Sequence, residues 1–105
     1  MPNIQFAIIL AGCGNKDGSE IHEATLALLA IHKLGCNFQC YAPDIEQHHV
    51  LNFINDEELT ETRNVLIESA RIARGNIKDL ATYSPDKYNG LIIPGGFGVA
   101  KNLTT

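Results

Sequence analysis

The chain has 105 residues, of which 45% are hydrophobic, and its formal net charge is −4 at pH 7. This length fits one domain or part of one, and the composition is typical of a globular protein. Only eight residues are Lys or Arg and they are spread along the chain, so we expect no nucleic-acid partner.

The first apolar segment, residues 4–11, is too short to span a bilayer. No Lys or Arg precedes it, so it lacks the charged start of a signal peptide. We therefore expect no membrane partner. The three cysteines are an odd number, which predicts reduced thiols, no disulfide framework and a cytoplasmic location.

The same segment is the first predicted strand, because its continuous apolar block is typical of a parallel strand covered on both faces. After a turn-rich loop, a helix capped by Ser19 with Glu20 behind it is predicted to end at Gly35. Its apolar positions recur at helical spacing and are Ile21, Ala24, Leu28 and Ile31. Residues 37–42 predict a second strand, so strand, helix and strand form a βαβ unit.

The rest of the chain predicts one more helix and one more long-range strand pairing. Residues 48–54 indicate a short strand or hairpin arm, and residues 55–58 a polar turn. A second helix is predicted over residues 62–74, ended by the glycine that follows it. Its inward face is Val65, Leu66, Ser69, Ile72 and Ala73. After a turn or short helix at residues 84–88, residues 90–93 form a strand that a right-handed crossover lays parallel to the first.

Two glycine-rich loops follow the predicted first and last strands, at residues 12–18 and 95–98. The carboxyl ends of parallel strands lie at one edge of a sheet, where α/β proteins bind their ligands. We therefore expect the two loops to face each other across a polar cleft, with free backbone N–H groups in the second loop. The residues predict an α/β domain with a ligand-binding cleft, but they do not name a reaction.

The glycines of the first loop also suggest a dinucleotide-binding fingerprint. Gly12, Gly14 and Gly18 stand between a strand and a helix, and Asp44 is a candidate for binding a ribose. The acidic side chains of this region would repel a pyrophosphate. They are Asp17, Glu20 and Glu23. Dinucleotide binding is therefore kept as a less favoured alternative, and no cofactor is expected.

Two glutamates and a cysteine are candidates for chemistry in the cleft. Glu20 lies at the start of the helix, where capping is its favoured role. Glu23 lies a turn further in, and we expect a partly buried carboxyl that points toward the strand ends and shares a proton with a nucleophile. Cys13 lies between two glycines and is either an exposed thiol at the cleft or a small packing residue.

The remaining cysteines and the histidines do not predict a metal site. Cys36 and Cys40 lie four apart on one strand and are most simply core residues. The histidines are not spaced as ligands on one face of an element. They are His22, His32, His48 and His49.

Polar residues near the two loops have both structural and functional interpretations. Asn64 either caps the second helix or reaches the cleft. We expect its neighbour Arg63 to pair with nearby glutamates at the surface. Lys101 and Asn102 follow the glycine turn, where they either bind a substrate oxygen or lie in solvent.

Motifs along nearly the whole chain together resemble one protein family. They are Gly12-Cys13-Gly14, Asp17-Gly18-Ser19-Glu20-Ile21-His22-Glu23-Ala24, Ala42-Pro43-Asp44, Thr62-Arg63-Asn64-Val65-Leu66, the segment 68–75, and Pro94-Gly95-Gly96-Phe97-Gly98 followed by residues 100–103. In this combination the chain resembles the ElbB group of the ThiJ/PfpI superfamily, named for enhancing lycopene biosynthesis. The resemblance implies a class I glutamine amidotransferase-like fold, which is a flavodoxin-like three-layer sandwich with a mostly parallel sheet.

The resemblance also implies roles for individual residues. In this superfamily a cysteine on a strand-to-helix elbow is the nucleophile, a glutamate contacts it, and a Pro-Gly-Gly turn supplies oxyanion donors. Carried over, Glu23 takes the glutamate role with Glu20 as the alternative, and Gly95 and Gly96 form the oxyanion turn. The substrate-binding candidates are Gly12, Cys13, Asn64, Phe97, Gly98, Lys101 and Asn102.

Members of this family are about twice as long, and none of the three cysteines here matches the elbow position. We therefore expect residues 1–105 to be the N-terminal part of a single domain and to be inactive alone. The resemblance implies a homodimeric, isoprenoid-biosynthesis-associated protein. Its complete form would be a cofactor-independent cysteine enzyme of glyoxalase type acting on small aldehydes or dicarbonyls. The alternative is a non-catalytic dimeric interaction or redox-sensing module with the same fold.

Overall fold

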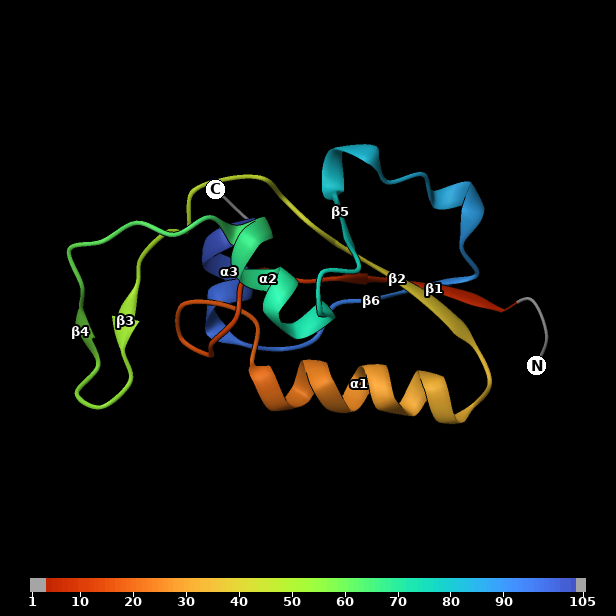
Figure 1. Cartoon of the computed structure of the whole chain (residues 1–105), viewed down its shortest axis with the longest axis horizontal. Helices are drawn as coiled ribbons and strands as arrows, with labels where there is room; N and C mark the ends of the chain where they lie inside the picture. Colours follow the sequence, from red (N-terminus) through yellow and green to blue (C-terminus); the bar gives the residue numbers. More distant parts are fainter. Residues whose placement is uncertain (1–3, 104–105) are drawn as a thin grey trace.

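The computed structural model of the chain describes residues 4–103 and is built on a four-stranded parallel sheet (Figure 1). The strand order is β5-β2-β1-β6. Its strands are β1 (Gln5–Ile9), β2 (Asn37–Ala42), β5 (Ile77–Asp79) and β6 (Gly90–Ile92). β1 pairs in parallel with both β2 and β6, which confirms the predicted βαβ unit and the predicted parallel pairing of the last strand.

Helices cover one face of this sheet and a tyrosine-containing segment covers the other, which gives three layers (Figure 1). On the first face, Ile8 and Leu10 pack against α1 (Ile21–Lys33) and α2 (Val65–Ala73). On the second face, Ala7 and Ile9 of β1 pack with the tyrosines and leucines of neighbouring elements. These are Tyr41, Leu80, Tyr83, Tyr88 and Leu103. The mostly parallel α/β fold predicted from the sequence is confirmed.

The segment that carries two of these tyrosines, residues 80–88, contains two short 3-10 helices, η1 (Leu80–Thr82) and η2 (Pro85–Lys87). The second of these confirms the turn or short helix predicted there. The hydroxyl groups of Tyr41 and Tyr88 form a hydrogen bond of 2.5 Å, and burial together with this bond raises the pKa of Tyr88 to about 12. The tyrosine layer is thus joined to the sheet by polar as well as apolar contacts.

A small antiparallel hairpin projects from this body on the left of Figure 1. Its arms are β3 (Leu51–Asn52) and β4 (Glu57–Glu58). The sequence predicts a short strand or hairpin arm for the first arm, which the structure confirms. The predicted polar turn at residues 55–58 is partly wrong, because its last two residues pair as β4.

The two main helices begin and end at residues with clear physical roles. Glu20 caps α1, since its carboxylate accepts hydrogen bonds from the backbone N–H groups of His22 and Glu23. The expectation that Ser19 is the cap is wrong, because its buried hydroxyl accepts instead from the N–H of Ala11. Asn64 caps α2, which is one of the two roles that the sequence left open, through a 2.9 Å hydrogen bond from the N–H of the residue three positions on.

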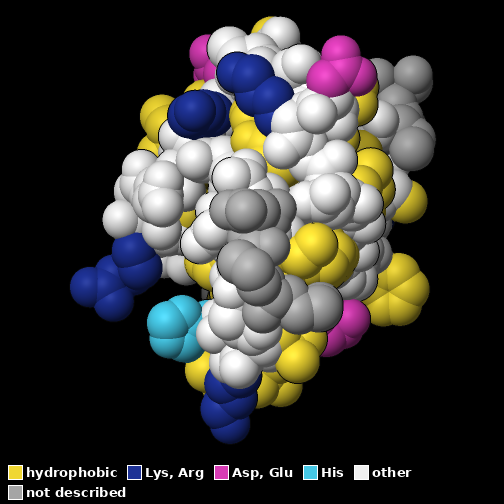
Figure 2. Space-filling model, turned by 90° about the vertical axis from the view of Figure 1, so that its right-hand side faces the viewer, with side chains coloured by type: hydrophobic (Ala, Val, Ile, Leu, Met, Phe, Trp, Pro, Cys, Tyr) yellow, Lys and Arg dark blue, Asp and Glu magenta, His cyan; other side chains and the backbone are white. Residues whose placement is uncertain are grey.

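Charged side chains are dispersed over the end of the molecule that lies on the right of Figure 1. Figure 2 shows this face, on which Lys and Arg side chains lie at separate places between hydrophobic ones. None of the helices described between residues 4 and 103 is long and apolar enough to cross a membrane.

Candidate functional site

The two glycine loops face each other at the carboxyl ends of β1 and β6, as the sequence predicts. The first loop, residues 12–18, leads into α1, and the second loop, residues 95–98, leads into α3 (Phe97–Leu103). The N–H of Glu20 donates to the carbonyl of Gly95 at 2.7 Å, and the N–H of Gly98 donates to the carbonyl of Asn15 at 3.0 Å. We call these two loops and the bonds between them the glycine junction.

The loops approach so closely because glycine stands at the points of contact. A Cβ atom at position 98 would overlap the backbone of Asp17 and Gly18, so α3 lies directly on the first loop. Gly96 has a φ of +134°, and a Cβ atom there would lie 2.5 Å from the carbonyl oxygen of Gly18. The sequence therefore specifies the junction through residues that have no side chain.

A cavity of about 320 Å³ opens beside the junction, lined by Asn15, Glu23, Gly96 and Phe97. A Cβ atom at Gly95 would collide with the carboxylate of Glu23, so this carboxylate lies directly against the glycine turn. The structure thus brings together the two groups to which the family resemblance gives roles in proton transfer and in oxyanion binding. Glu23 is exposed, however, so the expectation of a partly buried carboxyl is wrong for this chain.

The glycine turn offers two kinds of backbone N–H group. Within residues 4–103, the N–H groups of Gly95 and Gly96 make no hydrogen bond to the protein. The N–H of Gly98 donates to the carbonyl of Asn15, so this donor of the second loop is not free. Gly96 lines the cavity and Gly95 precedes it against the Glu23 carboxylate, so their N–H groups are candidates for binding an oxyanion.

Cys13, in the first loop, does not line this cavity. Its thiol is half-buried, and its pKa is raised by burial and then by the nearby carboxylate of Glu68. A raised pKa leaves less thiolate at neutral pH, so the environment disfavours a nucleophilic role. Cys36 and Cys40 are buried in the core as predicted, and burial raises the pKa of Cys40 to about 11.

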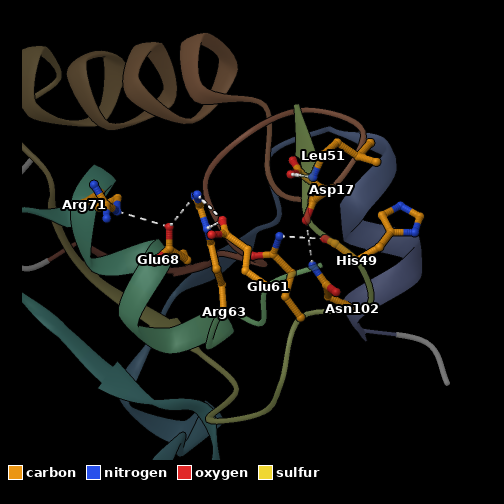
Figure 3. A network of polar contacts seen from close by, with 9 residues as sticks. Asp17, His49, Leu51, Glu61, Arg63, Glu68, Arg71 and Asn102 are labelled. Carbon is orange, nitrogen blue, oxygen red and sulfur yellow. Dashed lines mark hydrogen bonds and ion pairs between the residues drawn. The ribbon is translucent and has the colours of Figure 1, made fainter. Parts of the chain in front are cut away.

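Glu68 belongs to a chain of ion pairs along the start of α2, shown in Figure 3. Arg63 lies 2.6 Å from Glu61 and 3.4 Å from Glu68, and Arg71 lies 3.1 Å from Glu68. This confirms the predicted surface pairing of the arginines. Asn64 is used as the helix cap and by a 2.7 Å bond to Asp44, so the structure does not bring it to the Glu23 cavity.

Lys101 and Asn102 also make contacts within the protein and do not line the cavity. The ammonium of Lys101 lies 3.0 Å from the carbonyl of Lys16 and 2.7 Å from Nε2 of His49. Asn102 is buried, and its amide bonds to three backbone groups. Of the substrate-binding candidates, Phe97 alone is a lining residue of the Glu23 cavity.

Asn15 and His49 were not singled out by the sequence. Asn15 lines the cavity only because the first loop folds back on α3, and a position between glycines gives no signal of that. His49 contacts Lys101 across 52 positions of sequence, a pairing that no local pattern contains. No group of three or more metal-ligating side chains is found within the described part of the chain.

Comparisons with known proteins place these features in context. No family model matches the chain. It is 49% identical over 105 residues to the human protein "Glutamine amidotransferase-like class 1 domain-containing protein 3, mitochondrial", covering 99% of this chain and 39% of that protein. It is 48% identical to the rat "ES1 protein homolog, mitochondrial" and 33% identical to the zebrafish "ES1 protein, mitochondrial", of each of which it covers 40%.

A solved structure is also similar. It is the crystal structure of an isoprenoid biosynthesis protein with an amidotransferase-like domain from Ehrlichia chaffeensis, with a TM-score of 0.94 and 46% identity. The match covers 96% of this chain and 47% of that one. The chain therefore spans about two fifths of the length of these curated relatives and about half of the solved structure.

The comparisons correct the location expected from the sequence. The three curated relatives are named as mitochondrial proteins, which contradicts the expected cytoplasmic location. The odd number of cysteines was therefore a poor guide to the compartment.

Proposed function

We propose that the chain forms part of a cysteine-dependent active site. It aligns over nearly its whole length with a human protein named for a class 1 glutamine amidotransferase-like domain, at 49% identity, and with a solved amidotransferase-like structure, at 46% identity. In this proposal residues 1–105 are the N-terminal part of one ElbB-type domain that binds a small aldehyde or dicarbonyl. The Ehrlichia protein is described as an isoprenoid biosynthesis protein, and we extend that association to this chain.

The observation that carries the proposal is the position of Glu23 beside the glycine turn. Its carboxylate lies against Gly95 and lines the same cavity as Gly96, whose N–H is not used within residues 4–103. A base and candidate oxyanion donors thus lie next to each other at this cavity. This is the pair of functions that addition of a nucleophile to a carbonyl group requires.

The proposed chemistry is the conversion of a 2-oxoaldehyde to a 2-hydroxy acid. A cysteine thiolate adds to the aldehyde carbon, and the resulting oxyanion is stabilised by the N–H groups of Gly95 and Gly96 and protonated to a hemithioacetal. Glu23 takes the proton from C1 and returns it to C2, and the hydroxyl proton on C1 passes to the oxygen on C2, which gives the thioester of the 2-hydroxy acid. Water then hydrolyses the thioester, releasing the 2-hydroxy acid and the thiol.

The thiolate of this reaction comes from outside the described residues in our proposal. The cavity is lined by Asn15, Glu23, Gly96 and Phe97, whereas Cys13 does not line it and has a raised pKa. The chain spans less than half of its relatives, so a segment equivalent to their remaining length is the proposed source. We propose that the complete protein is a homodimer and uses no cofactor.

The test uses a hybrid in which this chain replaces the matching segment of the Ehrlichia protein, which is 46% identical. We expect the hybrid to convert methylglyoxal to lactate. Glu23→Gln should lower kcat/KM by about 10²- to 10⁴-fold, since the amide cannot take a proton. The matched control is Glu57→Gln, an exposed carboxylate on β4 that does not line the cavity, and it should leave turnover unchanged.

Two results would contradict the proposal in different ways. A folded hybrid without methylglyoxal turnover would reject the glyoxalase-type reaction. Turnover that is equal in the hybrid and in its Glu23→Gln variant would reject the role of Glu23 while leaving the activity in place.

The second candidate is a non-catalytic interaction module with the same fold. It is favoured by exposed hydrophobic side chains on and after β6, namely Leu91, Ile93 and Phe97. The redox-sensing form of this alternative is disfavoured by the raised pKa of Cys13. Fast alkylation of Cys13 in the folded chain would favour the sensor, and fast alkylation of a cysteine outside residues 1–105 would favour the enzyme.

A further inference from the structure

Asn102 joins three segments of the protein that are far apart in sequence. Its side-chain amide Nδ2 donates to the carbonyl of Ala11 at 2.8 Å and to that of Asp17 at 3.2 Å. Its Oδ1 accepts from the N–H of His48 at 2.8 Å. The residue is 2% exposed, so water does not replace these bonds.

The three bonded groups belong to the parts of the chain that surround the glycine junction. Ala11 follows β1, Asp17 lies in the first loop, and His48 precedes the hairpin. Figure 3 shows the Asn102 side chain bonded to Asp17, with His49 nearby. One amide in α3 therefore fixes that helix to the end of the central strand, to the first loop and to the approach to β3.

The position of α3 in turn determines the position of the glycine turn. Gly95 and Gly96 immediately precede α3, and Gly98 within it lies on the backbone of the first loop. Glu23, at the start of α1, follows the same loop. Any shift of α3 away from the loop therefore changes the distance between the N–H donors of the turn and the Glu23 carboxylate.

We propose that Asn102 is a positioning residue, which acts through α3 to hold the glycine turn at its distance from Glu23. Its catalytic consequence rests on the proposed function, whereas its geometric effect does not. Lys101 assists from the more exposed side of α3, through the carbonyl of Lys16 and through His49. The substrate-binding role expected for Asn102 from the sequence is thus replaced by an indirect one.

The amide is the side chain that this position requires. Alanine would leave two carbonyl groups and one N–H without partners in a buried place. Aspartate has nearly the same shape, but its carboxylate would accept only and would face the two carbonyl oxygens of Ala11 and Asp17. When protonated, aspartate regains one donor, so its effect should depend on pH.

The test is hydrogen exchange, resolved by residue, in the chain and its Asn102→Ala and Asn102→Asp variants. We follow the amides of Glu20 and Gly98, which donate across the junction to Gly95 and Asn15. Both variants should increase exchange of these two amides at least about tenfold relative to the amides of β1, because loss of buried bonds opens the junction locally. In Asn102→Asp the increase should shrink as the pH falls and the carboxyl becomes protonated.

The control is Asn64→Ala, which removes a helix cap with two side-chain hydrogen bonds outside the junction. It should destabilise the chain without changing the ratio between junction and β1 exchange. If the Asn102 variants raise the exchange rates of all amides by the same factor, Asn102 is only a stabilising residue and the proposal is overturned. If Asn102→Ala does not fold, the pH dependence of Asn102→Asp decides alone.

The hybrid protein separates this inference from the proposed function. There Asn102→Asp should lower kcat while changing KM little, because the turn acts on the oxyanion and not on the bound substrate. A hybrid without turnover, combined with local opening in the exchange experiment, would reject the enzyme and keep the positioning role. Normal turnover with no local opening would reject the positioning role alone.

Discussion

The glycine junction and the outer side of β6 lie next to each other in the chain. They differ in how many of their polar and apolar groups are bonded to or packed against the rest of the protein. The junction is irregular backbone, yet the bonds of Gly98, Glu20 and Asn102 tie its two loops together. β6 is a regular strand, yet Leu91 within it and Ile93 directly after it are 52% and 49% exposed. Regular secondary structure is therefore no measure of how completely a segment is packed.

The difference arises from the partners that each region has. β6 is the last strand of the order β5-β2-β1-β6, so in the described part of the chain it pairs on one side with β1. Phe97, which follows it, is 66% exposed at the rim of the Glu23 cavity. An unpaired strand edge with exposed apolar side chains is a surface at which other chains can pair or pack. The two loops of the junction are thus bonded to each other, which we call the closed region. The outer side of β6 carries exposed apolar side chains, and we call it the open side.

The largest effect is expected when the close contact in the junction is broken by Gly98→Ala. The added Cβ would overlap the backbone of Asp17 and Gly18, and backbone cannot rotate away as a side chain can. We expect the free energy of unfolding to fall by about 3 kcal/mol or more, measured by denaturant titration.

The control is Gly75→Ala, at a glycine with φ of +82° and no atom within 4 Å of the added Cβ. It should cost about 1 to 2 kcal/mol, because a left-handed conformation alone is strained in alanine. Equal losses in the two variants would mean that the junction is not closely packed. The comparison with β6 would then lose its basis.

The sequence predicted the elements whose patterns are local. The apolar block of β1, the helical spacing of α1 and α2, and the alternation of β2 each reflect burial along a single element. β5 was missed, since its three residues show no periodicity and form a strand only by pairing with β2. Edge strands of this length cannot be recognised without their partner.

The site could be predicted only as far as topology determines it. That the two loops meet follows from the direction of β1 and β6, and this was expected. The exposure of Glu23 and the internal bonds of Asn102 were not, because they depend on which surfaces cover which side chains. Chemical type and spacing identify a polar residue as a candidate, but they do not show whether it faces a cavity or another part of the backbone.

The next largest effect is expected for the alkylation rate of the Cys13 thiol, in the first loop of the junction. Burial and the neighbouring Glu68 raise the pKa of Cys13, so its thiolate fraction at pH 7 is lower than in an unfolded chain. Iodoacetamide should therefore modify Cys13 more slowly in the folded chain than in the same chain in urea, as measured by residue-resolved mass spectrometry. Faster modification in the folded chain would show that this side of the junction is open and reactive.

A smaller effect is expected from the cap at the start of α1. Hydrogen bonds from the backbone of His22, and also of Glu23, lower the pKa of Glu20 from its ordinary value of 4.5. A lowered pKa in the folded state stabilises the fold above pH 4.5, and this contribution is lost as the pH falls through the folded-state pKa. The unfolding midpoint should thus fall more steeply below pH 4.5 in the native chain than in Glu20→Gln.

The control for this prediction is Glu57→Gln, which removes an exposed carboxylate that caps no helix. Its acid dependence should follow that of the native chain. If the unfolding midpoint of Glu20→Gln also falls as steeply as that of the native chain, the Glu20 cap does not contribute to the pH dependence of stability.

The smallest effect on stability is expected on the open side, from the double variant Leu91→Thr and Ile93→Thr. Both side chains are about half exposed, and threonine has the β-branched shape that suits a strand. We expect the free energy of unfolding to change by less than about 0.5 kcal/mol. Self-association at high concentration, measured by sedimentation velocity, should decrease because the apolar edge becomes polar.

The strand provides its own control in Ile92, which lies between these two residues and packs against the core on the helical face. Ile92→Thr should lower the free energy of unfolding by about 1 to 2 kcal/mol and leave self-association unchanged, since it alters the packed face and not the open one. Three adjacent substitutions to threonine thus distinguish the two faces of one strand.

If the double variant is as unstable as Ile92→Thr, the outer side of β6 is packed in solution by the chain itself, and the contrast with the junction disappears. If it is stable but associates as strongly as the native chain, the apolar contact between copies lies elsewhere, and Phe97 is the next side chain to replace.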